Sequence, residues 1–452
     1  MALDVRKTAL LILNALETGR QTLDHLLEEA CSANVRFAQR DRALLNALVY
    51  GVLRWRGRLD FIIAKFSQTP PRKIDSQVLN ILRLGLFQII YLDRVPDSAA
   101  VNTSVELTKS MAAPWVSGFV NALLRRAARD HRRVAFPKSD DDPVTALAAG
   151  KSFPPWLVER WLKRFTPAQV GSFCDALNTI PPTTLRTNTL RTSRAKLLQA
   201  LAGEVATIEP TAFAPDGLCC YQPKTPVPKL KGFADGWFQV QDEAAQLVSL
   251  FFNPQPGDTV LDACAGLGGK TGHIAQLMQD RGTITALDHN SQKLRQLRLE
   301  MQRLGLSSVS TCPHDLDNPW GQPPAPRFDG ILLDAPCSGL GTMRRNPDVK
   351  WASGKQNLRR YQTRQLKFLD RLAPLAKPSG IMVYAVCSTE PEETHEVVQA
   401  FLKKRPEFAI DTSLGELPPK ALTAVDAQGY FRTFPFLNTM DGFFAVRLRR
   451  IS

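Results

Sequence analysis

The stretch that decides the fold of the C-terminal half is Gly330-Ile331-Leu332-Leu333-Asp334-Ala335-Pro336-Cys337-Ser338-Gly339. A short apolar run that ends at a carboxylate and a proline turn is typical of a parallel strand buried on both faces. In sheets built from such strands, ligands bind beyond the carboxyl ends of the strands. The sequence therefore predicts that Asp334 and Cys337 lie at the edge of the sheet where chemistry takes place.

A second thiol repeats this arrangement fifty residues later. Cys387 follows the apolar run 380–386, and it too is followed by a serine. Taken alone, either cysteine would be interpreted as a core residue, because free cysteines are among the most buried residues. Two thiols at strand ends, one of them beside Asp334, instead favour a shared crevice with a chemical role.

From Asp258 onward, predicted strands and helices alternate, which indicates a doubly wound α/β domain. The predicted strands are 259–263, 283–288, 309–312, 329–334 and 381–386, and the predicted helices are 271–278, 291–304, 357–375 and 392–404. Residues 443–448 are expected to close the sheet as an antiparallel edge strand.

A glycine-rich turn connects the first of these strands to the first helix. It consists of Cys264, Ala265, Gly266, Leu267, Gly268, Gly269 and Lys270. Glycines at such a turn allow the backbone to approach a ligand closely. A phosphate-binding loop would need glycine at Cys264, and a dinucleotide fingerprint would need glycine or alanine at Thr271. ATP hydrolysis and hydride transfer are therefore disfavoured.

The remaining requirements describe a ligand with a ribose and an adenine but no phosphate, which is S-adenosylmethionine. Asp288 ends the second strand and is placed to bind ribose hydroxyls. Asp315 follows the third strand and is placed to accept from the adenine amino group. The competing interpretations are a charge at the start of a helix for Asp288 and a turn residue for Asp315.

Bulk composition points to a polyanionic partner. The 452 residues carry a net charge of +14 with a pI near 9.5, and residues 1–130 read as consecutive amphipathic helices with clustered arginines. A merely basic soluble protein is the alternative, but basic helices favour nucleic acid. Eight cysteines without a CxxC pair predict neither disulfides nor a metal site. No membrane span or signal segment is expected, so the protein is predicted to be cytoplasmic. It is also expected to be a monomer.

The two halves resemble known families. Arg40-Asp41-Arg42-Ala43-Leu44 and Phe119-Val120-Asn121-Ala122-Leu123 resemble the NusB-type RNA-binding domain. The two cysteine motifs, with Arg344-Arg345-Asn346-Pro347-Asp348 and Asp441-Gly442-Phe443-Phe444, resemble the two-cysteine RNA (cytosine-5) methyltransferases, and with the NusB-like front end the Fmu/Sun type that acts on 16S rRNA. Together, these two resemblances cover nearly the whole chain.

The resemblance implies a multidomain fold. We expect an all-α NusB-like RNA-binding domain over 1–135, a linker over 136–152, a small α+β intermediate segment over 153–240, and a Rossmann-like class I methyltransferase domain over 241–452. It implies S-adenosylmethionine contacts from Cys264 to Lys270 and from Asp288, Asp315 and Asp334. Gly266-Leu267 stands where the family usually has Ala-Pro, and Val386 where it usually has Thr, which puts the rate of reaction in doubt.

The predicted chemistry is covalent catalysis on cytosine. Cys387 as thiolate adds to carbon 6, Asp334 pairs with N3 and the exocyclic amine, and Cys337 assists release; the family assigns the same two roles to the thiols. A cation or helix terminus is expected near Cys387 to lower the thiol pKa. The cytosine must be single-stranded or flipped from its stack.

Contacts to the RNA strand are expected from the loop after Cys337 and the helix beyond it. Arg344, Arg345 and Lys350 would bind phosphates, and Trp351 and Tyr361 would offer stacking faces.

Three other functions compete with methylation of 16S rRNA. The same reaction on tRNA and a non-enzymatic rRNA-binding assembly factor remain open. A DNA cytosine methyltransferase is disfavoured by analogy, because its nucleophile would be expected in the Pro-Cys motif.

Overall fold

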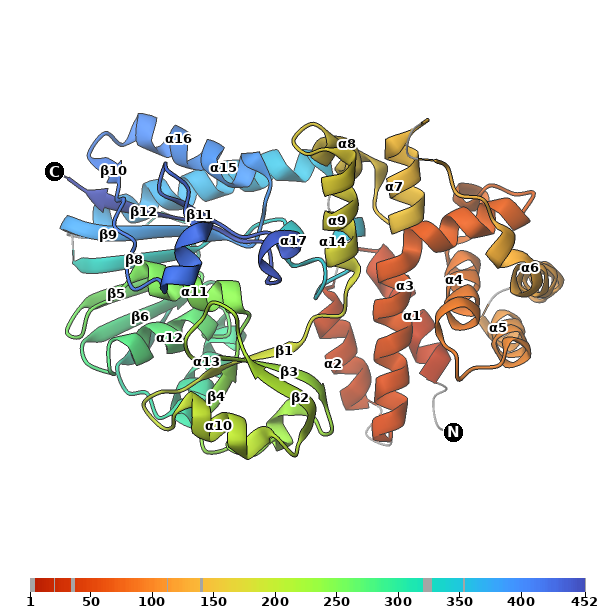
Figure 1. Cartoon of the computed structure of the whole chain (residues 1–452), viewed down its shortest axis with the longest axis horizontal. Coiled ribbons are helices and arrows are strands. Elements are labelled where there is room, and N and C mark those ends of the chain that lie inside the picture. Colours follow the sequence, from red (N-terminus) through yellow and green to blue (C-terminus); the bar gives the residue numbers. More distant parts are fainter. Residues whose placement is uncertain are drawn as a thin grey trace. The chain divides into compact units, whose positions relative to one another are not determined.

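The computed structural model describes residues 5–19, 21–33, 37–111, 113–138, 141–319, 327–352 and 354–451. The chain divides into two compact units. The first, here called the helical unit, comprises Met1–Thr179 together with Met343–Ser353. The second, here called the sheet unit, comprises Ile180–Thr342 and Gly354–Ser452. Figure 1 labels the elements of both.

Amphipathic helices form the helical unit, as their apolar spacing predicts. They pack around one core that includes Leu13, Leu48 and Leu82, all nearly inaccessible to solvent. The α3 and α4 backbones approach so closely that a Cβ at Gly51 would lie 1.9 Å from the Phe87 ring, so only glycine fits there. The helices are α1 (Val5–Glu17), α2 (Leu23–Ala33), α3 (Gln39–Phe66), α4 (Ser76–Tyr91), α5 (Asp97–Met111), α6 (Ser117–Asp130), α7 (Pro143–Lys151), α8 (Pro155–Leu162), α9 (Pro167–Asn178) and α14 (Val349–Ala352).

The segment 136–152, expected to be a linker, differs from that expectation. Residues Pro143–Lys151 form α7, whose buried Leu147 and Ala148 belong to the helical unit. The Asp142 side chain caps α7 by accepting from the Thr145 amide at 3.0 Å. An Asp-Pro pair is a loop signal, but it is also the usual start of a helix, with Asp as the cap and Pro as the first helical residue.

A small antiparallel sheet opens the sheet unit. Its strand order is β2-β3-β1-β4, and α10 packs on it through Leu197 and Leu201 against Leu185 and Leu218. Alternating apolar side chains give this sheet one buried face. The elements are β1 (Thr183–Thr187), α10 (Arg194–Leu201), β2 (Val205–Pro210), β3 (Gly217–Pro223) and β4 (Phe238–Val240).

The large sheet has eight strands, of which seven follow the order β10-β12-β9-β8-β5-β6-β7, while β11 pairs only with β12. The strands from β9 to β7 are parallel, and β12 runs antiparallel to β9. The strands are β5 (Thr259–Ala263), β6 (Thr283–Asp288), β7 (Val309–Pro313), β8 (Phe328–Asp334), β9 (Ala376–Val386), β10 (Phe408–Ile410), β11 (Tyr430–Arg432) and β12 (Phe444–Arg450).

The prediction that residues 443–448 form the edge strand is wrong in one respect. The strand is antiparallel, as expected, but β12 lies inside the sheet, between β9 and β10. The edge is β10, a strand of three residues that is too short to show an alternating pattern.

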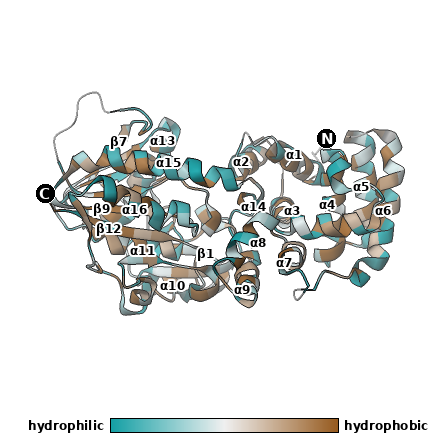
Figure 2. Ribbon diagram, turned by 90° about the horizontal axis from the view of Figure 1, so that it is seen from above, coloured by the Kyte–Doolittle hydropathy of each residue, from teal (hydrophilic) through white to brown (hydrophobic). Residues whose placement is uncertain are grey.

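Helices cover both faces of the large sheet. Alternate strand residues point to opposite faces, so Val260 packs with α12 and α13 while Leu261 packs with α15 and α16. In Figure 2 the central strands are apolar and α15 is largely hydrophilic. The helices are α11 (Glu243–Phe252), α12 (Gly269–Leu277), α13 (Ser291–Leu304), α15 (Lys355–Leu372), α16 (His395–Lys404) and α17 (Pro435–Asn438). This is the doubly wound α/β architecture predicted from the sequence. Among the described residues, no helix has the length and apolarity that crossing a bilayer requires.

Candidate active site

The two predicted thiols meet beyond the carboxyl ends of adjacent parallel strands. Cys337 follows β8 and Cys387 follows β9, and their Sγ atoms lie 3.3 Å apart. Backbone hydrogen bonds fix the two turns against each other: the Ala335 amide donates to the Ala385 carbonyl at 2.9 Å, and the Gly341 amide to the Cys387 carbonyl at 3.0 Å. The thiols are reduced and partly accessible, so a ligand can reach them.

The surroundings of Cys337 favour its protonated form. The hydrogen bond to Cys387, then burial, then the charges of Cys387 and Glu393 raise the pKa of the Cys337 thiol well above its ordinary value. The Cys337 thiol therefore stays protonated at neutral pH, in hydrogen-bond contact with the sulfur of Cys387.

Asp334, at the end of β8, is paired with a buried lysine. Its Oδ2 lies 2.6 Å from Nζ of Lys270, whose side chain is only 11% exposed. Burial alone would lower the pKa of Lys270, but the Asp334 carboxylate and, more weakly, Cys387 raise it overall. Lys270 is thus a stable cation that interacts with both Asp334 and Cys387, and it is the positive charge expected near the nucleophile.

The turn between β5 and α12 has the backbone that its glycines predict. Gly266 and Gly268 have φ values of 58° and 84°, and Cys264 also has a positive φ of 63°. Added Cβ atoms at Gly266 and Gly269 would meet nothing within 4 Å, so open space borders the turn there. Helix α12 begins at Gly269 rather than at the predicted residue 271, which places Lys270 in its first turn.

Three carboxylates lie at the ends of β5, β6 and β7. Asp288 is buried and accepts from the Gly266 amide at 3.0 Å and from the Asn290 amide at 2.8 Å, so it braces the turn. Asp315 is half-buried and accepts from the Asp317 amide at 2.9 Å. Burial raises the pKa of Asp262 to about 7, although it accepts from the Thr271 hydroxyl at 2.6 Å.

One residue of this site escaped the sequence analysis. Glu393, in the turn after β9, is fully buried and accepts hydrogen bonds from the serines that follow both cysteines. Its Oε1 accepts from the Ser338 amide at 2.7 Å, and its Oε2 from the hydroxyls of Ser338 and, at 2.6 Å, of Ser388. Burial raises the pKa of Glu393, and these hydrogen bonds partly offset that rise. The repeated Cys-Ser pairs were the signal that could have revealed a common acceptor.

Replacing Glu393 by alanine is expected to lower the free energy of unfolding by about 3 kcal/mol, because one amide and two hydroxyls lose their buried acceptor. Glu393→Gln should lower the free energy of unfolding by less than Glu393→Ala, since the hydroxyls of Ser338 and Ser388 can rotate and donate elsewhere. Chemical denaturation followed by circular dichroism measures the loss. The matched control is Glu392→Gln, its half-buried neighbour. Equal stability of Glu393→Ala and the control would contradict the bracing role.

Several residues predicted to contact RNA lie in the core of the helical unit instead. Lys350 is fully buried, and its Nζ donates to the Asn178 side chain at 2.6 Å and to the Arg54 carbonyl at 3.2 Å. Trp351 donates from Nε1 to the Leu53 carbonyl at 2.7 Å. Arg344 is also buried, at 5% exposed. The phosphate role of Lys350 is therefore wrong, because its ammonium is fully buried, whereas Trp351 is half-buried and its stacking role stays a prediction.

A buried arginine of the small sheet, also unforeseen, touches the glycine turn. Arg186 donates to the Gly269 carbonyl at 2.9 Å and to the Gln239 side chain at 2.8 Å. Burial lowers its pKa to about 9. The small sheet thus supports the first turn of α12. Among the described residues, no group of three or more His, Cys, Asp or Glu side chains is arranged to hold a metal ion.

Comparisons with known proteins agree with this architecture. Residues 249–449 match the family model described as "16S rRNA methyltransferase RsmB/F", residues 3–129 match the NusB family, and residues 153–227 match the ferredoxin-like domain of RsmF/B-like methyltransferases.

Full-length relatives were also found. The chain is 36% identical over 448 residues to the "Probable ribosomal RNA small subunit methyltransferase B" of a Synechocystis species, covering 99% of this chain and 100% of that protein. It is 34% identical over 449 residues to the protein of the same name from Bacillus subtilis, covering 99% and 98%. The crystal structure of PH0851 shares the fold, with a TM-score of 0.81 at 23% identity and 99% coverage of both chains.

Both the multidomain fold and the family predicted from the sequence are confirmed by these findings. With a NusB domain in front, a ferredoxin-like domain between, and a doubly wound sheet carrying two adjacent thiols, the chain belongs to the RsmB/F family of 16S rRNA methyltransferases.

Proposed function

We propose that this protein transfers a methyl group from S-adenosylmethionine to carbon 5 of a cytosine in 16S rRNA, through a covalent adduct between Cys387 and carbon 6. The observation that carries the proposal is the pair of thiols, whose Sγ atoms lie 3.3 Å apart beyond the carboxyl ends of adjacent parallel strands. A direct methyl transfer to an oxygen or nitrogen atom would not require a pair of thiols.

The substrate class is supported by charge and by the relatives. The net charge of +14 suits a polyanion, and on α6 the side chains of Arg125, Arg126 and Arg129 are exposed. The proteins from Synechocystis and Bacillus subtilis are named ribosomal RNA small subunit methyltransferases. Together these support 16S rRNA as the RNA.

The residues at the glycine turn fit S-adenosylmethionine. Open space at Gly266 and Gly269 leaves room for a ligand against the backbone. Asp288 and Asp315 lie at the ends of β6 and β7, where they would hold the ribose and the adenine amine. When bound, S-adenosylmethionine supplies an electrophilic methyl group on a sulfonium sulfur. The turn from Cys264 to Lys270 would hold the remainder of the molecule.

Cys387 would begin the reaction by adding to carbon 6 of the cytosine. This addition breaks the 5,6 double bond and makes carbon 5 nucleophilic. As negative charge develops on the ring, N3 would take up a proton from solvent, and the Asp334 carboxylate would accept hydrogen bonds from the protonated N3 and from the exocyclic amine. Lys270 holds that carboxylate in place at 2.6 Å. Carbon 5 can then accept the methyl group.

Cys337 would complete the reaction as a thiolate that removes the proton from carbon 5, so that the 5,6 double bond re-forms and the sulfur of Cys387 leaves as a thiolate. In the free protein the hydrogen bond to Cys387 is the largest cause of the raised pKa of Cys337. Once Cys387 is bonded to carbon 6 it carries no charge, so this cause disappears and Cys337 gives its proton to solvent more readily. The same thiol is thus protonated before the adduct forms and a base after it. The base must be single-stranded or flipped to reach both thiols.

Mapping 5-methylcytosine in cellular RNA by bisulfite sequencing, with and without the gene, tests the proposal. One methylated cytosine in 16S rRNA should disappear on deletion and return with the wild-type gene, but not with a Cys387→Ala gene. Loss of a site in tRNA instead would favour the same reaction on tRNA. Unchanged methylation in all RNAs would favour a non-enzymatic assembly factor and overturn the proposal.

A further inference from the structure

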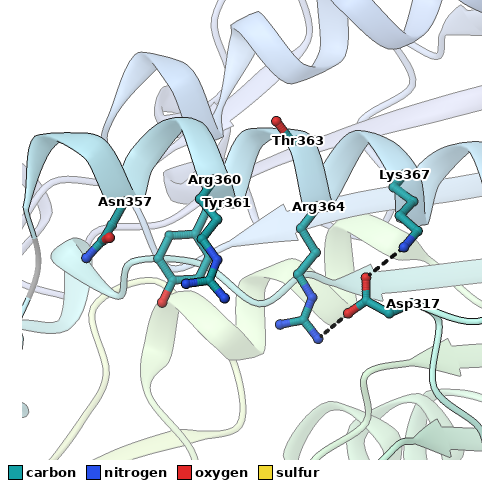
Figure 3. Close-up of a pocket in the computed structure, with 7 residues that line it drawn as sticks. All are labelled: Asp317, Asn357, Arg360, Tyr361, Thr363, Arg364 and Lys367. Atoms are coloured by element: carbon teal, nitrogen blue, oxygen red, sulfur yellow. Dashed lines mark hydrogen bonds and ion pairs between the residues drawn. The ribbon is translucent and has the colours of Figure 1, made fainter. Parts of the chain in front are cut away.

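Beside the proposed reaction site, the sheet unit has a basic cavity that the mechanism does not use. The cavity has a volume of about 680 Å³, which is within the range of ligand sites. Six of its seven lining residues come from α15, and the seventh is Asp317, in the turn after β7 (Figure 3). Figure 3 shows the side chains of Arg360, Tyr361 and Arg364 projecting to the same side of α15.

The cavity carries a net positive charge. Arg360, Arg364 and Lys367 supply three cations against the single carboxylate of Asp317. Asp317 pairs with Arg364 at 2.8 Å and with Lys367 at 3.1 Å. Partial burial opposes it, but these two partners lower the pKa of Asp317, so the carboxylate is charged at neutral pH. Two of the three cations are thus held in position by one acid.

The third cation is available for a ligand. Arg360 is exposed and has no ion pair among the described residues. Arg364 is paired with Asp317 through its Nη2 at 2.8 Å. A guanidinium group with unused donors, such as that of Arg360, matches the geometry of a phosphate.

The cavity adjoins the thiols. Gln365, one turn after Tyr361 on α15, donates to the carbonyl of Pro336, the residue before Cys337, at 3.0 Å. The phenol of Tyr361 is half-buried, and burial first and then the nearby Cys337 thiol raise its pKa. An aromatic ring beside a cytosine-binding crevice, with arginines next to it, is the arrangement that binds an unstacked nucleotide.

We propose that this cavity binds the nucleotide next to the target cytosine, with its phosphodiester on Arg360 and Arg364 and its base stacked on Tyr361. The inference rests on the proposed function for the identity of the cytosine, but it concerns binding rather than methyl transfer. A cavity of this kind would hold the RNA strand at the point where the target base leaves the stack.

The test measures binding of a short single-stranded RNA containing one cytosine to the full-length protein at several salt concentrations. Arg360→Ala should weaken binding and reduce the slope of log Kobs against log salt by about 0.7, the value for one lost phosphate contact to a single strand. Arg359→Ala is the matched control, because Arg359 is also exposed on α15 but does not line the cavity. Arg359→Ala should change the slope of log Kobs against log salt less than Arg360→Ala does.

Three further variants examine the other parts of the cavity. Tyr361→Leu should weaken RNA binding about tenfold and Tyr361→Phe should not, because stacking needs the ring and not the hydroxyl. Asp317→Asn should tighten binding by up to about fivefold at low salt, since it removes the competing negative charge.

Affinity for S-adenosylhomocysteine separates this inference from a role in cofactor binding. It should be unchanged in Arg360→Ala. Equal RNA binding by Arg360→Ala and Arg359→Ala, or a loss confined to S-adenosylhomocysteine, would overturn the subsite while leaving the proposed function standing. If the wild-type protein methylated no cytosine but Arg360→Ala still lowered the salt slope, the proposed chemistry would fall and the subsite would remain.

Discussion

Cys337→Ala is expected to accumulate a covalent complex with RNA, whereas Cys387→Ala is expected to form none. The adduct requires the sulfur of Cys387, and its resolution requires a base for the proton on carbon 5. With Cys337 removed, no other thiol lies within hydrogen-bond distance of Cys387 among the described residues. Turnover by Cys337→Ala should fall about 10²- to 10⁴-fold, the usual contribution of a positioned acid or base.

Denaturing gel electrophoresis of the protein after incubation with labelled 16S rRNA and S-adenosylmethionine measures the adduct. Cys387→Ala should lose both the adduct and all methyl transfer. Cys219→Ala is the control, because Cys219 lies in β3 of the small sheet. Its adduct and turnover should equal those of the wild type. An adduct in Cys387→Ala would mean that the roles of the two thiols are reversed.

The pH dependence of the same reaction follows from the Cys337 pKa. Because that pKa is raised well above its ordinary value, Cys337 should stay protonated through neutral pH in the free protein. Replacing Cys337 by alanine removes the protonated thiol that faces Cys387. Adduct formation by Cys337→Ala should therefore depend differently on pH from that of the wild type, as measured by single-turnover kinetics.

Asp334→Asn is expected to reduce kcat/KM for RNA methylation about 10²- to 10³-fold, the typical effect of removing one charge-stabilising group. The variant loses the negative charge that would accept a hydrogen bond from the protonated N3 of the cytosine. It also leaves the buried Lys270 ammonium without its 2.6 Å partner. Burial would then dominate and lower the pKa of Lys270.

Asp329→Asn provides a control on the same strand. Asp329 lies near the start of β8 and pairs with Lys377 at 2.8 Å, so both variants remove one carboxylate from one lysine. Single-turnover methylation and S-adenosylhomocysteine affinity should be measured together for both. Asp329→Asn should react at the wild-type rate, and a similar rate for Asp334→Asn would remove Asp334 from the mechanism.

Part of the site followed from the sequence because it depends on local pattern. Apolar runs that end at Asp262, Asp288 and Asp334 mark strand ends, and glycines mark the turn between β5 and α12. Parallel strands place their carboxyl ends together, so the two thiols had to lie at the same edge of the sheet. The boundaries of these elements agree with the structure to within a few residues.

The remaining features depend on contacts between distant segments. The sequence does not show that Lys270 reaches Asp334, sixty-four residues away, or that Glu393 accepts from both Ser338 and Ser388. It also suggested an exposed loop at Lys350, where the structure has a buried lysine in the helical unit. A lysine looks the same in a sequence whether its ammonium faces water or three oxygen acceptors.

The sequence by itself determined the α/β sheet, the helical front end, the glycine turn and the two thiols at strand ends, because each depends on periodicity or residue type over short distances. Only the tertiary structure decided how close the two thiols lie, which acid joins the two cysteine turns, and which basic residues are buried or exposed. Those properties arise from burial and from the charges brought within a few ångströms, and both depend on how segments far apart in the chain pack together.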